Sequence, residues 1–120
     1  KQPNAAQPQE QLLSYVTEVL LAYEGMDAEH QIQTEGIAML TDAQQKILKD
    51  YQRDIVRQLS AILARCAPDA FNADAAKLNA TTMSVFGMLN WYYMWHPNAD
   101  NAARRDYAKL ISDLVLKGIG

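Results

Sequence analysis

Apolar residues recur at steps of three and four along most of the chain, the spacing that puts them on one face of an α-helix. Leu12, Val16, Val19 and Tyr23 predict one such helix, and the stripe Leu48, Tyr51, Ile55, Leu59, Ile62 and Cys66 predicts another. No stretch alternates between apolar and polar residues for long enough to favour a β-strand. The pattern predicts an all-α fold of five helices, at about residues 9–24, 28–40, 41–66, 72–96 and 100–118.

Turn and cap residues mark where these helices begin and end. Thr41-Asp42-Ala43-Gln44 has the spacing of a capping box, in which side chains satisfy free backbone donors at a helix start. Gly25, Pro68 and Gly118 are expected to end helices. Residues 1–8 are polar with two prolines and are expected to be a linker, so that 9–120 form a single domain.

The segment 81–97, TTMSVFGMLNWYYMWHP, concentrates aromatic and methionine side chains more than any other. One row of its helix is mostly apolar: Leu78, Thr82, Val85, Leu89, Tyr92 and Trp95. A second row mixes amide, thioether and ring: Asn79, Met83, Phe86, Asn90 and Met94. Both rows can be explained as core, but the second also fits the wall of a ligand pocket, which is apolar with a few placed polar groups. One small domain cannot cover both rows, and self-association would supply the missing surface.

Composition narrows the possible functions. The chain has 120 residues and a net charge of −3, which argues against nucleic-acid binding by this segment alone. A single cysteine, Cys66, excludes an intramolecular disulfide and fits a reducing cytosol. No apolar run approaches the ~20 residues of a membrane span. A cytoplasmic domain without membrane attachment is therefore expected.

Catalytic and metal-binding patterns are missing from the sequence, so neither an enzyme nor a cofactor is expected. Cys66 lies on an apolar stripe and is expected to be a structural thiol. His30 has no ligand at helical spacing, so no metal site is expected there. His96 is expected at a helix C-terminus, and Arg104-Arg105 is expected to be a solvated pair, with contact to an anionic ligand as the alternative.

The last third of the chain carries a more specific signal. The run FGMLNWYYMWHPNAD at 86–100 is followed by a helix that ends in LISDLVLKGI. It resembles the C-terminal part of TetR-family transcriptional regulators, in which Gly-x-Leu-Asn-Trp-x-x-x-Trp and a proline turn precede a leucine-rich last helix. The matching residues are Gly87, Leu89, Asn90, Trp91, Trp95, Pro97 and Gly118. His96 differs from the family, whose members often have tyrosine at this position.

This resemblance implies a homodimer that binds a small hydrophobic effector, such as an acyl-CoA-like metabolite. It implies that DNA is bound only through an N-terminal helix-turn-helix outside this sequence. The pocket is expected to involve Met83, Phe86, Asn90, Met94, Tyr51 and Tyr23. The last two helices would form the dimer interface, with Trp95, Tyr92, Tyr107, Ile111 and Leu114. Two alternatives stay open: a helical dimerisation or adaptor module without a small ligand, and a small helical enzyme or metal carrier.

Overall fold

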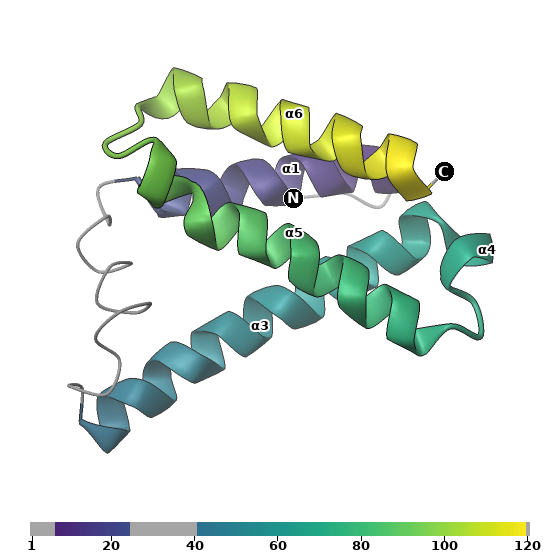
Figure 1. The fold of residues 1–120 in the computed structure, drawn as a ribbon, viewed down its shortest axis with the longest axis horizontal. Coiled ribbons are helices and arrows are strands. Elements are labelled where there is room, and N and C mark those ends of the chain that lie inside the picture. Colours follow the sequence, from purple (N-terminus) through teal and green to yellow (C-terminus); the bar gives the residue numbers. More distant parts are fainter. Residues whose placement is uncertain (1–6, 25–40, 120) are drawn as a thin grey trace.

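The computed structural model describes residues 7–24 and 41–119, and this part of the chain consists of helices without any strand (Figure 1). The helices are α1 (Pro8–Ala22), α3 (Asp42–Cys66), α4 (Pro68–Phe71), α5 (Ala75–Trp95) and α6 (Asn101–Ile119). The predicted all-α fold is thus confirmed. The helix expected at 28–40 and the glycine stop at Gly25 lie outside the described residues.

The helices begin where side chains can satisfy their free backbone donors. At α3 the predicted capping box is present: Thr41 Oγ1 accepts from the Gln44 backbone N–H at 3.1 Å, and Gln44 Oε1 accepts from the Thr41 N–H at 3.0 Å. Asp74 caps α5 by accepting from the Lys77 N–H at 3.0 Å, and Asp100 serves α6 in the same way through the Ala103 N–H at 2.9 Å.

Two helix ends differ from the sequence-based expectation. Pro68 does follow the end of α3, but it then starts the short helix α4, whose Phe71 is buried in the core. Gly118 was expected to stop the last helix, yet α6 continues through it to Ile119. A glycine lowers helix propensity by about 1 kcal/mol relative to alanine but does not by itself end a helix.

α1 lies at the centre of the packing. It runs alongside α6 and also packs on α3, while α5 packs mainly on α3 (Figure 1). The core between them is apolar and includes Leu12, Val16, Leu20, Leu59, Leu63, Val85, Leu89 and Ile111. The structure is therefore built from two helix pairs, α1 with α6 and α3 with α5, joined through α1 and α3.

Contacts between aromatic rings hold α5 and α6 together near the turn that joins them. The Tyr92 ring stacks on Tyr107 with centroids 4.3 Å apart, and Trp95 meets Tyr92 edge-on at 4.9 Å. Beyond this cluster α5 and α6 diverge (Figure 1). The two helices are thus tied at one end and open at the other.

Arg104 is buried beneath this cluster, contrary to the expectation that it is solvated. It is 2% exposed, and its guanidinium lies 5.6 Å from the centre of the Tyr92 ring. Its Nε donates to the Ala99 carbonyl at 2.8 Å, and its Nη1 donates to the Leu20 carbonyl at 3.1 Å. One side chain therefore links the α5–α6 turn to the C-terminal end of α1.

We expect Arg104→Ala to lower the free energy of unfolding by about 3 kcal/mol, because two buried carbonyls would lose charged donors. Urea denaturation followed by circular dichroism measures this loss. Arg105→Ala is the matched control: Arg105 is exposed, and among the described residues its side chain bonds only to Asn101 on its own helix, so its loss should be within about 0.5 kcal/mol. Equal effects of the two substitutions would contradict this account of Arg104.

Candidate functional site

Helix α5 is apolar or uncharged on all sides over most of its length. From Leu78 to Trp95 it contains no Asp, Glu, Lys or Arg. One side faces the core through Val85, Leu89 and Tyr92. The other sides form one wall of a groove and an outward surface. Since a helix that is hydrophobic all round is normally buried, both of these sides are candidate functional surfaces.

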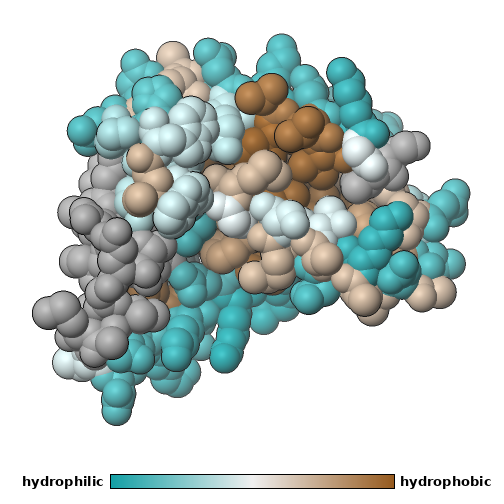
Figure 2. Space-filling model, viewed as in Figure 1, coloured by the Kyte–Doolittle hydropathy of each residue, from teal (hydrophilic) through white to brown (hydrophobic). Residues whose placement is uncertain are grey.

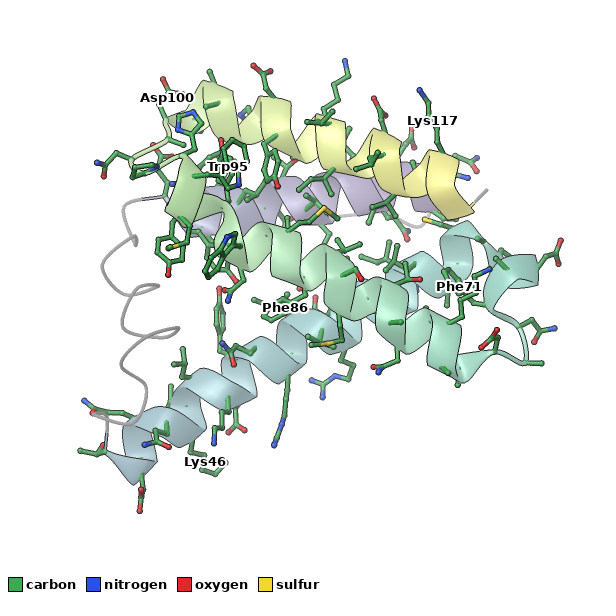
Figure 3. All side chains as sticks on the ribbon, viewed as in Figure 1. Lys46, Phe71, Phe86, Trp95, Asp100 and Lys117 are labelled. Carbon is green, nitrogen blue, oxygen red and sulfur yellow. The ribbon has the colours of Figure 1, made fainter. Side chains whose placement is uncertain are left out.

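The groove lies between α3 and α5 and encloses about 630 Å³. This volume is within the range of about 300–1,000 Å³ typical of small-molecule sites. α5 contributes Leu78, Asn79, Thr82, Met83 and Phe86, and α3 contributes Lys49, Gln52, Arg53, Val56, Arg57, Ser60, Ala61 and Ala64. Figure 3 shows Phe86 between the two helices. The groove thus has an apolar floor with polar and basic side chains along α3.

Two of the predicted pocket residues, Met83 and Phe86, line this groove, and the other four do not. Tyr23 is buried in the core, and Tyr51 lines a smaller hollow between α1 and α3 together with Tyr15. Met94 is exposed beyond the groove. The row of α5 residues is regular, but α3 diverges from α5 and so covers only its N-terminal part (Figure 1).

Asn90 lies between the groove and the end of α5. Its side-chain oxygen is buried and has no hydrogen-bond partner among the described residues. Buried polar atoms are nearly always paired, so this oxygen is an available acceptor close to Phe86, one helical turn away. The structure places Asn90 beside the groove and not in its lining.

None of the α3 residues that line the groove was predicted from the sequence as a pocket residue. Lys49, Arg53 and Arg57 lie outside the apolar stripe of α3, on the face of the helix that carries its charged residues. Their spacing of four residues places them on one side of the helix, which is the only sequence signal that could have grouped them. In the structure, α5 lies across the groove from that side of α3.

The outward surface of α5 and α6 is also rich in apolar groups. Trp91 is 52% exposed, Trp95 57%, and Leu110 and Leu114 are each 61% exposed. Figure 2 shows hydrophobic surface in the space between α5 and α6. Exposed apolar patches of this kind on a folded domain typically mark an interaction site.

Gly87 is exposed and lies one helical turn before Trp91 on α5. A Cβ added at Gly87 would meet no side chain and no neighbouring element of the described residues within 4 Å, so contacts with this part of the chain do not require a glycine there. Glycine within a helix costs about 1 kcal/mol relative to alanine. Gly87 is therefore a candidate position for close approach by a partner.

The predicted interface residues fall into two groups. Trp95 and Leu114 are exposed and Tyr107 is half-buried, so all three retain surface for a partner. Tyr92 and Ile111 are only 2% and 1% exposed, because Tyr92 stacks on Tyr107 and Ile111 packs in the core. Those two support the outward surface from beneath and have almost no area left to contact a second copy.

Burial shapes the acid–base behaviour of several side chains near these surfaces. It raises the pKa of Tyr15 to about 12, with a smaller contribution from the Asp54 carboxylate, and it raises the pKa of Tyr23 further. It also raises the pKa of the half-buried Cys66 thiol, which fits a structural thiol and not a reactive one.

We expect the protein to lose stability as the pH rises from about 10 to about 12, because unfolding frees buried tyrosines to ionise near their ordinary pKa of about 10. The raised pKa of Tyr15 contributes stability that is complete below that range and is lost within it. Tyr15→Phe should therefore show a smaller fall in urea midpoint between pH 9 and pH 11 than the unchanged protein. Identical falls would contradict this contribution from Tyr15.

Among the described residues, no helix is long and apolar enough to cross a membrane. The same part of the chain holds no cluster of three or more residues suited to bind a metal ion. His96 directly follows α5 as its C-cap, the position expected for it. These observations leave the groove and the outward surface as the two candidate sites.

Comparison with known families identifies the class of domain. Residues 5–119 match the family described as "Tetracyclin repressor-like, C-terminal domain". Searches of curated proteins and of solved structures gave no match. The match covers nearly the whole chain and agrees with its all-α architecture. The chain therefore belongs to the family of tetracycline repressor-like C-terminal domains, which are regulatory domains of TetR-type transcription factors.

Proposed function

We propose that this domain forms a homodimer through the outward surface of α5 and α6 and binds a small hydrophobic effector in the groove between α3 and α5. In this proposal the effector, such as an acyl-CoA-like metabolite, regulates DNA binding by a helix-turn-helix elsewhere in the parent protein. Family membership supports a sensing and dimerisation role. The assignment of residues to dimerisation or to effector binding rests on their positions around α5.

The observation that carries the proposal is that one helix serves both surfaces. Leu78, Thr82 and Phe86 of α5 line the groove. On the outward side of the same helix are Gly87 and Trp91, and none of the described residues packs over Gly87. An occupant of the groove therefore touches the helix that would contact the second subunit.

This arrangement suggests a population shift as the mechanism. An effector can favour one conformation only if it binds that conformation more tightly. A molecule wedged between α3 and α5 would favour the separation of the two helices that it fits, and α5 would change its angle at the dimer interface. Small shifts of packed helices at an interface can then become rotations of whole subunits. Such rotations would change the distance between two DNA-reading domains, which must match sites about one turn of DNA apart.

Close packing of two α5 helices requires the glycine, so Gly87→Leu should break the dimer. Each subunit should stay folded and become about 0.8 kcal/mol more stable, because leucine favours a helix and its Cβ would meet none of the described residues outside its own helix turn. Analytical ultracentrifugation measures the association, and circular dichroism measures the fold. We expect a dimer for the original sequence and a folded monomer for the variant.

Ala43→Leu provides the control, because Ala43 is exposed in the first turn of α3, away from the outward surface. This variant should remain dimeric. A monomeric original sequence, or a dimer unaffected by Gly87→Leu, would contradict the proposed interface.

Effector binding can be tested by thermal unfolding with a panel of acyl-CoA thioesters and aromatic acids. A ligand that binds only the folded protein raises its melting temperature, and a concentration of 100 Kd contributes about 2.7 kcal/mol. Ala61 is an exposed residue of the groove, and Ala61→Trp should fill the space and remove the shift without unfolding the protein. If no compound shifts the melting temperature while the dimer forms, the domain is a dimerisation module without a small ligand.

A further inference from the structure

The charge of the groove differs from that of the chain. The whole protein has a net charge of −3, yet the groove lining contains three basic residues, Lys49, Arg53 and Arg57, and no acidic residue. All three come from α3 at intervals of four, so they follow one side of that helix. The groove is therefore a positive site on a negative protein.

The three basic groups are not equally neutralised by their neighbours. Arg57 is paired closely with Asp54, at 2.6 Å. Arg53 lies 3.9 Å from Asp50, whose carboxylate is held more closely by Lys46, at 2.8 Å. Lys49 has no ion pair among the described residues. The charges most available to a ligand are thus those of Lys49 and Arg53.

These two side chains lie at one end of the groove. Lys49 and Arg53 belong to the first half of α3, where α3 and α5 diverge (Figure 1). Near the other end, where α4 connects the two helices, the lining is mostly small or apolar, with Ala61 and Ala64 of α3 and Leu78 of α5, and it also includes the polar Asn79. Val56 and Phe86 lie between the two ends. The basic groups with the weakest ion pairs thus lie at one end of the groove, and most of its small and apolar residues lie toward the other.

We propose that the occupant of this groove is an amphiphilic anion. Its apolar chain or ring system lies along Val56, Leu78 and Phe86, and its carboxylate or phosphate group is bound by Lys49 and Arg53. This inference rests on the proposed function, because it names the chemical class of the effector. It also assigns to two residues of an ordinary charged helix face the recognition of the ligand's head group.

The basic groups favour an anion because arginine and lysine form short, charge-assisted hydrogen bonds to carboxylates and phosphates. Because Lys49 and Arg53 are exposed, salt should weaken the contribution of the head group and leave that of the apolar chain unchanged.

The test uses probes that share one chain length and differ in charge: decanoate, decyl phosphate, 1-decanol and decyltrimethylammonium. Isothermal titration calorimetry on the 120-residue protein at low salt measures each affinity. We expect both anions to bind roughly tenfold or more tightly than decanol, and the cation to bind more weakly than decanol. Decanoate and decyl phosphate together show which head group is preferred.

Three variants locate the charge effect. Lys49→Gln with Arg53→Gln should weaken both anions roughly tenfold and leave decanol unchanged. Lys109→Gln with Lys117→Gln removes the same charge from exposed positions of α6. It should change neither the affinity for the two anions nor the affinity for decanol. Ala61→Trp should abolish binding of every probe while the protein stays folded by circular dichroism.

The outcomes separate this inference from the proposed function. Equal affinity for anions and decanol, unaltered by loss of Lys49 and Arg53, would overturn the anionic ligand and leave a hydrophobic sensor standing. Failure of every probe to bind would overturn the sensor as well. Undiminished binding to Ala61→Trp would place the site elsewhere, and dissociation of the dimer by that variant would show that a second copy fills the groove. Either of these two results would also overturn the inference.

Discussion

Water cannot solvate α5 as it solvates an ordinary surface helix, and much of the structure follows from that constraint. Between Leu78 and Trp95 no charged side chain is available to face solvent, so each side of the helix needs a cover. The core of α1 and α3 covers one side. The other two sides stay open in a single subunit, one above the groove and one across Gly87 and the tryptophans. The proposed effector and the proposed second subunit are the two molecules that would complete its burial.

In the proposed function, an occupant of the groove would affect the outward surface of α5 because the packing of the domain is uneven. α5 packs mainly on α3, and α6 packs mainly on α1. The aromatic rings around Tyr92 hold α5 and α6 together at one end only. Arg104 then anchors that end to α1 through the Leu20 carbonyl. A change in the spacing of α3 and α5 would therefore pivot α5 about a fixed point. The charges of Lys49 and Arg53 at one end of the groove would favour the binding of the proposed anionic ligand there.

The sequence was a good guide wherever one residue acts on its own helix. The Thr41 capping box, the core stripes of α1 and α3, and the place of His96 were all predicted, because helix periodicity and capping depend on local spacing. It was a poorer guide wherever the burial or the contacts of a residue depend on a neighbouring helix. Tyr92 and Ile111 lie on the helices proposed for an interface, but their own subunit buries them. Arg104 was assigned to solvent because no local pattern indicates that the Leu20 carbonyl lies within its reach. In the same way, periodicity grouped Phe86 with Asn90 and Met94, and only the divergence of α3 separates them.

Gly87 would increase the share of stability that the proposed dimer gains from association. Each subunit carries a glycine that weakens its own helix, and in the proposed dimer this loss would be offset only when a partner packs against it. Because association stabilises the folded state by mass action, the melting temperature would rise with protein concentration. Newly made subunits would therefore be at their least stable while they are scarce. In the proposed dimer, the lifetime of each subunit would therefore depend on the concentration of the same protein.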